Sequence, residues 1–252
     1  MRFASLGSGS RGNATLVEAD GTCLLVDCGF SVSETRARLA RLSVEADSIA
    51  AILVTHEHTD HASGVARVAA RFGIPVWCTA GTLNASTRYG LESATLFNPH
   101  DVFSIGAIEV TPVAVPHDAR EPAQFIFSDG QRRFGMLTDT GHITPHIERV
   151  FDGCDALLIE CNHDAGLLMD GPYPPSLKAR VGGPLGHLSN AQAAALLATL
   201  DLGRLQHLVA AHLSDKNNTP ALAQAALAEA ADCEPDWIAV ADQLDGLDWR
   251  SI

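Results

Sequence analysis

Residues 55–61 read Thr-His-Glu-His-Thr-Asp-His and directly follow the apolar run at 50–54. Four side chains that can bind a metal, at His56, His58, Asp60 and His61, therefore lie where a short buried strand is expected to end. In an extended or tightly turned backbone, His56 and His58 point the same way, and Asp60 and His61 can turn toward a second position. Imidazole nitrogens and carboxylate oxygens suit Zn²⁺, Mn²⁺ or Fe. The segment predicts a metal centre.

Apolar runs on both sides of this segment predict further short buried strands, at 23–27, 50–55, 74–78, 134–139, 156–161 and 207–212. Helical patterns lie between them, at 33–42, 190–200 and 221–231, and Ser31-x-x-Glu34 is a capping box in front of the first. This alternation predicts layers of helices around stacked sheets. Pro172, Pro174 and Pro175 indicate a long loop over 165–185.

A glycine pattern near the start, Gly7-x-Gly9-x-x-Gly12, matches the dinucleotide-binding fingerprint. That fingerprint needs a helix to begin at the glycines, whereas residues 13–27 read as two strands joined at Asp20-Gly21. We therefore expect a turn between strands here, and no dinucleotide site.

Bulk composition narrows the class of protein. With 252 residues, 46% of them hydrophobic, the chain can bury a large core, and we expect one domain over 1–252. The start lacks the apolar run of a secretory signal, no later apolar stretch approaches membrane-spanning length, and the six cysteines form no CxxC pair. We expect a cytoplasmic protein with reduced thiols and no membrane partner. The net charge of −13 shows no overall excess of the basic residues that bind polyanions.

The string His-x-His-x-Asp-His at 56–61 resembles the signature of the metallo-β-lactamase superfamily. The resemblance implies an α/β fold, a four-layer αββα sandwich of two mixed sheets flanked by helices. It also implies roles for one residue before this string and three after it. Asp27 would orient the metal-binding loop without binding the metal itself. His117, Asp139 and His212 would complete the ligand set.

By that resemblance two divalent ions are implied, Zn²⁺ or Mn²⁺ and possibly Fe. The first would be held by His56, His58, His117 and Asp139, and the second by Asp60, His61, Asp139 and His212. A hydroxide bridging the ions would be the nucleophile, because bound metal lowers the pKa of water toward neutrality. Asp60 is also a candidate for orienting that hydroxide.

Several longer words, among them SLGSGSRGNAT, VPHDA, IECNHD and HLSDKNN, resemble the YycJ/WalJ-like branch of the superfamily, which is related to its phosphodiesterases and nucleases. The short interval between Asp139 and His212 leaves no room for the inserted nucleic-acid domain of the RNase J type. We therefore expect a single catalytic domain.

His187, in Gly-His-Leu-Ser, is our candidate for the general acid, because phosphodiester cleavage needs a proton for the leaving alkoxide. Phosphodiesterases that resemble this chain place a helper histidine in the same interval. The alternative is a histidine that caps the helix after Ser189. Candidates for substrate contact are Asn162, His163 and Ser214, with local hydrogen bonding as the alternative for His163.

Three functions remain open from the sequence. The first is a binuclear metal-dependent phosphodiesterase or nuclease that acts on DNA or RNA. The second is a small-molecule hydrolase, for a cyclic phosphodiester or a thioester of the glyoxalase II kind, which the acidic net charge favours. The third is a metal-binding regulatory domain without turnover, against which the full ligand set argues.

Overall fold

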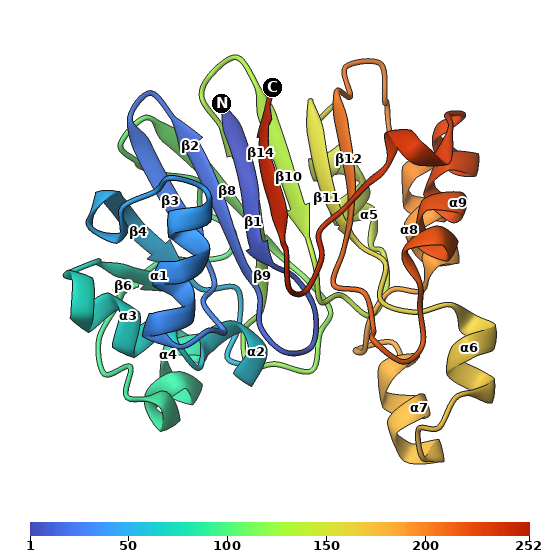
Figure 1. Ribbon diagram of the computed structural model, residues 1–252, viewed down its shortest axis with the longest axis horizontal. Coiled ribbons are helices and arrows are strands. Elements are labelled where there is room, and N and C mark those ends of the chain that lie inside the picture. Colours follow the sequence, from blue (N-terminus) through green and yellow to red (C-terminus); the bar gives the residue numbers. More distant parts are fainter.

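Short apolar strands form two mixed sheets of seven strands each in the computed structural model, which describes residues 1–252 (Figure 1). The first sheet has the order β14-β1-β2-β3-β4-β5-β6, with β1 (Arg2–Gly7), β2 (Ala14–Ala19), β3 (Thr22–Val26), β4 (Ile49–Leu53), β5 (Val76–Cys78), β6 (Thr95–Leu96) and β14 (Leu247–Ser251). The second has the order β13-β12-β11-β10-β9-β8-β7, with β7 (Phe103–Ile105), β8 (Ile108–Ala114), β9 (Ala123–Ser128), β10 (Arg133–Leu137), β11 (Ala156–Glu160), β12 (His207–Ala211) and β13 (Ala239–Val240).

The two sheets pack face to face around an aromatic core. Phe3 of the first sheet stacks on Phe134 of the second, with ring centroids 4.1 Å apart. In β3, Leu24 and Val26 belong to this inner core, while Cys23 and Leu25 face the outer side, as the two-residue period of a strand requires. Both faces of the strand are buried, which explains why its sequence is continuously apolar.

Helices cover both outer faces and complete four layers (Figure 1). The first sheet is covered by α1 (Val32–Arg41), α3 (Val65–Phe72) and α4 (Ala80–Ser86). The second is covered by α5 (Pro145–Phe151), α8 (Asn190–Leu197) and α9 (Pro220–Ala231). The remaining elements are α2 (Thr59–Ala62), α6 (Ala165–Asp170), α7 (Pro175–Val181) and the 3-10 turns η1 (Ala46–Ser48), η2 (Thr87–Tyr89) and η3 (Pro235–Trp237). The predicted αββα sandwich is thus confirmed. None of the helices combines the length and apolar character needed to cross a membrane.

Local signals in the sequence account for several element boundaries. Ser31 caps α1 through the predicted capping box with Glu34. Asp20 and Gly21 have φ values of 44° and 78° and join β2 to β3 in a tight hairpin. The glycine-rich residues 8–13 connect β1 to β2 without a helix, so the predicted turn between strands is confirmed.

The prediction of a long loop over 165–185 is wrong, because this segment forms α6 and α7. Asp164 caps α6 by accepting a hydrogen bond from the backbone N–H of Leu167. Pro175 occupies the first turn of α7, where proline fits because that N–H needs no helical partner. The proline cluster therefore separates two helices and starts the second.

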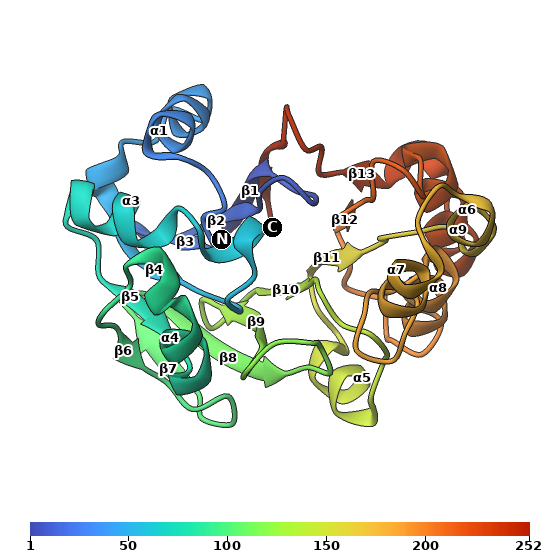
Figure 2. The same ribbon diagram turned by 90° about the horizontal axis from the view of Figure 1, so that it is seen from below.

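The carboxyl ends of several strands meet at one edge of the sandwich, which Figure 2 shows from below. Strand β3 is parallel to β4, and β10, β11 and β12 are parallel to one another. Loops that leave parallel strands at the same edge come together in space, and in α/β sheets this edge is where ligands bind. The predicted site residues follow these strands.

Candidate metal centre

The predicted site residues lie at this common edge, in loops or, for Asp60 and His61, in the short helix α2. Asp27 follows β3, residues 55–61 follow β4, His117 follows β8, Asp139 follows β10 and His212 follows β12. Asp27, Asp139 and His212 all have left-handed backbones, with φ values of 61°, 51° and 55°. Such conformations are strained for residues other than glycine and gather at functional sites. The chain leaves the extended conformation at these three residues, so the strands end there.

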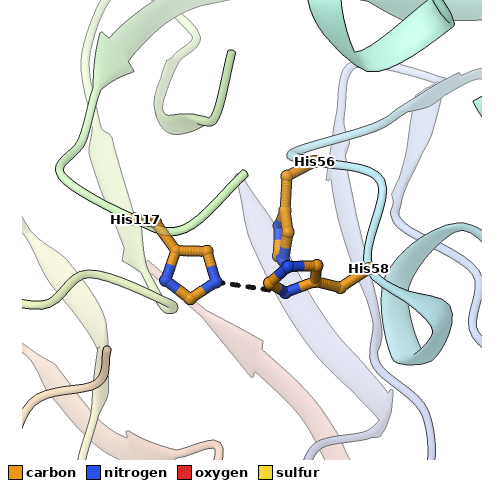
Figure 3. Close-up of side chains that lie close together, drawn as sticks. All are labelled: His56, His58 and His117. Atoms are coloured by element: carbon orange, nitrogen blue, oxygen red, sulfur yellow. Dashed lines mark hydrogen bonds between the residues drawn. The ribbon is translucent and has the colours of Figure 1, made fainter. Parts of the chain in front are cut away.

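Three imidazoles converge in the first cluster, His56, His58 and His117 (Figure 3). His117 donates from Nδ1 to the carbonyl oxygen of Gly186 at 3.0 Å, and His58 donates from Nε2 to that of Asp118 at 3.2 Å. In the neutral rings these bonds leave His117 Nε2 and His58 Nδ1 without hydrogens, yet the two nitrogens lie 3.2 Å apart. Two lone pairs that face each other at this distance repel, and either a proton or a bound metal ion between them would remove the repulsion.

His56 likewise has one ring nitrogen that donates a hydrogen bond and one that carries no hydrogen. The hydroxyl of Thr55 donates to Asp27 at 2.7 Å, so its oxygen accepts from Nδ1 of His56 at 2.9 Å. The other ring nitrogen, Nε2, is then unprotonated, and it is buried with no hydrogen-bond partner. Burial, together with the neighbouring His61, holds the pKa of His56 well below its usual value, so this ring stays neutral and able to bind a metal.

The second cluster combines Asp60, His61 and His212 around Asp139. Nδ1 of His61 donates to Asp27 at 2.8 Å, which leaves Nε2 facing Asp139 Oδ2 at 3.1 Å and Asp60 Oδ2 at 3.4 Å. Nε2 of His212 lies 3.4 Å from the same oxygen of Asp60. Asp139 Oδ2 is buried and makes no hydrogen bond despite its short contact with His61. Burial alone would lower the pKa values of His61 and His212, but the charge of Asp139 raises both, and a divalent ion would pair with the same carboxylates.

The donor set and the orphaned atoms together fit divalent metal ions. Unpaired buried polar atoms are costly, and natural proteins satisfy nearly all of them with protein, water or ions. Here the orphaned His56 Nε2 and Asp139 Oδ2 lie in clusters whose other members are imidazole nitrogens and carboxylate oxygens. This is ligand chemistry suited to Zn²⁺ or Mn²⁺.

Asp27 accepts hydrogen bonds from both the backbone and the side chains of the metal-binding segment 55–61. Its Oδ1 accepts from the backbone N–H of Thr55 at 2.8 Å, and its Oδ2 accepts from the Thr55 hydroxyl and from His61. It is almost fully buried. A carboxylate in this place fixes the tautomer and orientation of a ligating histidine, which is the role predicted for it.

Glu160 at the end of β11 supports His187. Its Oε1 accepts from Nδ1 of His187 at 2.8 Å and from Nδ1 of His212 at 3.0 Å. Its Oε2 accepts from the backbone N–H groups of Thr140 and Leu188. The pKa of His187 is raised, because the charge of Glu160 outweighs the effect of burial. The helix at 190–197 is capped by Ser189 with Gln192, so His187 is not its cap.

A central cavity of about 370 Å³ opens above the clusters. His187, Asn162 and Ser214 line it, together with Arg88, Tyr173 and Arg180. His163 lies apart, because it lines a different cavity between α6, α7 and α8.

Comparison with known proteins places the chain in a family. A family model described as "Beta-lactamase superfamily domain" matches residues 22–212. Exodeoxyribonuclease YycJ of Bacillus anthracis is 35% identical over 91% of this chain and 88% of that protein, and exodeoxyribonuclease WalJ of Streptococcus pneumoniae is 34% identical over 88% and 85%. The chain belongs to the metallo-β-lactamase superfamily. The solved metallo-β-lactamase fold protein YhfI from Bacillus subtilis covers 99% of both chains with a TM-score of 0.75 and 14% identity, a likeness of fold.

The match to the superfamily confirms the predicted class of protein, a metal-dependent hydrolase. The identity to the two exodeoxyribonucleases confirms the predicted resemblance to the YycJ/WalJ branch. Membership of the superfamily also agrees with the two clusters that fit divalent ions.

Three residues of this metallo-β-lactamase site were absent from the sequence prediction. Glu160 carried the same signal as Asp27 and Asp139, an acidic residue at the end of an apolar strand, and could have been found by it. Asn13 brings its amide nitrogen within 3.2 Å of Asp60. The carboxylate oxygen Oδ1 of Asp118 lies 3.4 Å from Nε2 of His58, and Oδ2 accepts from Nε of Arg180 at 2.6 Å. Both residues lie within words that carry the resemblance, SLGSGSRGNAT and VPHDA, but no spacing pattern marks either as a site residue.

Proposed function

We propose that the chain is a phosphodiesterase that cleaves nucleic acid, with DNA ends as its first candidate substrate. The observation that carries the proposal is the pair of Glu160 and His187 at the wall of the central cavity, beside both metal clusters. Phosphodiester cleavage needs a proton donor for the leaving alkoxide, and this pair supplies one. The names of the YycJ and WalJ relatives, both exodeoxyribonucleases, support the same reaction.

Two divalent ions per chain, Zn²⁺ or Mn²⁺ with Fe as the third option, form part of the proposal. His56, His58, His117 and Asp139 would hold the first, and Asp60, His61, Asp139 and His212 the second. Bound there, the ions would activate water and offset the negative charge of the phosphate.

The chain's own side chains position the reaction. Because Nδ1 of His187 is held by Glu160, Nε2 is the ring nitrogen free to give its proton to the leaving oxygen. Asp60, whose Oδ2 lies between His61 and His212, would orient the attacking water. Asn162 and Ser214 are candidates for substrate contact from the wall of the central cavity, and His163, whose buried Nδ1 makes no hydrogen bond, is a candidate from the cavity between α6, α7 and α8.

A small-molecule hydrolase is the second candidate, and the modest cavity and the net charge of −13 favour it. We also propose that the whole chain, 1–252, acts as one catalytic unit, and that it works in the cytoplasm, where its six free cysteines would stay reduced.

The test is hydrolysis by the metal-loaded protein. The substrates are end-labelled single- and double-stranded DNA and RNA, bis(p-nitrophenyl) phosphate, S-lactoylglutathione and nitrocefin. We expect cleavage of the diesters and of DNA, with shortening from one end. Turnover of the thioester or the lactam without cleavage of any nucleic acid would contradict the proposal and support the second candidate.

A further inference from the structure

A second cavity, of about 530 Å³, lies beside the central one. It is lined by Glu57, Gly81, Asn84, Ala85, Arg88 and Arg120. Arg88 lines both cavities, so the two adjoin at its side chain. We call the second one the Arg88–Arg120 cavity.

Both arginines of this cavity lack an acidic partner. Neither guanidinium forms an ion pair, and the side chain of Arg120 makes no hydrogen bond at all. Five other arginines form ion pairs with carboxylates, among them Arg180, which pairs with Asp118. Two unpaired cations that line one cavity are notable in a protein with a net charge of −13, and a bound anion would pair them.

Glu57 is the single carboxylate that lines the cavity, and it positions the two arginines. Its Oε1 accepts from the backbone N–H of Arg120 at 2.9 Å, and its carbonyl oxygen accepts from Arg88 at 2.7 Å. Glu57 is almost fully buried, whereas Arg88 and Arg120 are exposed. The accessible surface of the cavity is therefore cationic.

The cavity lies close to the metal clusters along the chain. Glu57 stands between His56 and His58 in the sequence. Arg120 follows His117 by three residues, so its backbone is at most about 11 Å from that of His117. Arg88 lies in η2, directly after α4, and Figure 2 shows α4 and α7 on opposite sides of the edge that holds the site. The Arg88–Arg120 cavity is thus on the α4 side of the metal centre.

We propose that the Arg88–Arg120 cavity binds the phosphodiester that neighbours the scissile one in a nucleic-acid strand. The proposal rests on the proposed function, and it names the substrate as a chain with more than one phosphate. Guanidinium groups bind phosphate oxygens through paired hydrogen bonds, and the amide of Asn84 adds a further donor. The strand would run from the α4 side across Arg88 into the central cavity.

The test compares substrates with and without the neighbouring phosphate. Thymidylyl-thymidine has one phosphodiester, and a short oligothymidylate has several. In the metal-loaded wild-type protein we expect the lower KM for the longer substrate. Arg120→Ala should raise the oligothymidylate KM about three- to tenfold relative to the KM for thymidylyl-thymidine. Arg120→Lys should restore part of the difference, because it restores the charge.

Binding gives a second measurement. The affinity for a labelled oligothymidylate, measured by anisotropy at several salt concentrations, should depend less steeply on salt in Arg120→Ala. The slope should fall by about 0.7 for each phosphate that the variant no longer neutralises. The matched control is Arg36→Ala, since Arg36 is exposed on α1, makes no ion pair and lines neither cavity. It should behave as wild type with both substrates.

The outcomes separate the two proposals. If the wild-type protein cleaves oligothymidylate but Arg120→Ala changes neither the KM ratio nor the salt slope, the phosphate site is wrong and the proposed function stands. If the wild-type protein neither binds nor cleaves either substrate, both are wrong. If Arg36→Ala had an equal effect, the effect of Arg120→Ala would come from the overall charge of the protein. That result would also overturn the phosphate site.

Discussion

The carboxylate of Glu160 lies 2.8 Å from Nδ1 of His187, and the same oxygen lies 3.0 Å from Nδ1 of His212. One fully buried acid thus holds both a predicted proton donor and a predicted metal ligand. Burial alone would raise the pKa of Glu160, but the charge and hydrogen bond of His187 lower it to about 2. Glu160 is therefore ionised at neutral pH and acts as a positioning residue for both histidines.

Glu160→Gln should narrow the pH range of activity. The amide keeps the size of the side chain but loses the charge that raises the pKa of His187. Since a general acid must be protonated, the basic limb of the kcat profile should move to lower pH. Metal affinity should also fall about 10–100-fold, because His212 loses its partner. The profile is measured with the metal content checked at each pH, and an unmoved basic limb at full metal occupancy would contradict this role.

His187→Ala should affect substrates according to their leaving groups. Cleavage of a nucleotide diester, whose leaving alkoxide needs a proton, should fall about 10²–10⁴-fold. Hydrolysis of bis(p-nitrophenyl) phosphate should fall far less, because its phenolate leaves without a proton. Metal content should stay at the wild-type value. Equal losses on both diesters would assign His187 to substrate positioning, and loss of metal would make it a ligand.

His58→Ala should remove one ion and abolish turnover of both diesters. The variant breaks the cluster in which His58 Nδ1 faces His117 Nε2. His100→Ala is the matched control, because His100 is exposed in a turn outside both clusters. Elemental analysis of the two variants checks the prediction, and full metal content in His58→Ala would exclude His58 as a ligand.

Away from the site, Asp155→Asn should lower the free energy of unfolding by about 2 kcal/mol at neutral pH. Asp155 is fully buried and accepts from the backbone N–H of Arg133 and from the side chains of Arg132 and Arg204. Burial alone would raise the pKa of this carboxyl, but these hydrogen bonds lower it.

Because the folded-state pKa of Asp155 is lowered, its contribution is present above the unfolded value of about 3.9 and is lost as the pH falls through the folded value. Urea unfolding of wild type and variant at several pH values should show a difference that shrinks in acid. Asp47→Asn, at an exposed residue without partners, is the control. A difference independent of pH would mean that the charge of Asp155 is not the cause.

Local signals in the sequence predicted the layers of the fold and drew attention to residues 55–61, whereas the roles of His117, Asp139 and His212 came from the resemblance to the metallo-β-lactamase superfamily. Residues 55–61 carry four metal-binding side chains together, and Asp27 and Asp139 each end an apolar strand. The proline cluster misled the prediction of α7, because a proline can start a helix as well as interrupt one.

Other parts of the site depend on tertiary placement. Arg88 lies in a 3-10 turn and Arg120 in the loop after β8, and only the fold brings both to Glu57. No spacing of residues along the chain indicates that Arg88 and Arg120 both contact Glu57. Glu160 is different, since its strand-end position was visible and its role appears only from its contacts with His187 and His212.

The most direct test of the account is a metal titration of the chelator-treated protein, in which cleavage of an end-labelled DNA strand is followed as Zn²⁺ or Mn²⁺ is added. Because the proposed ligands form two sites that share Asp139, we predict no cleavage without metal and a rise that ends near two ions per chain. Cleavage by the metal-free protein, or full activity at one ion per chain, would contradict a binuclear phosphodiesterase.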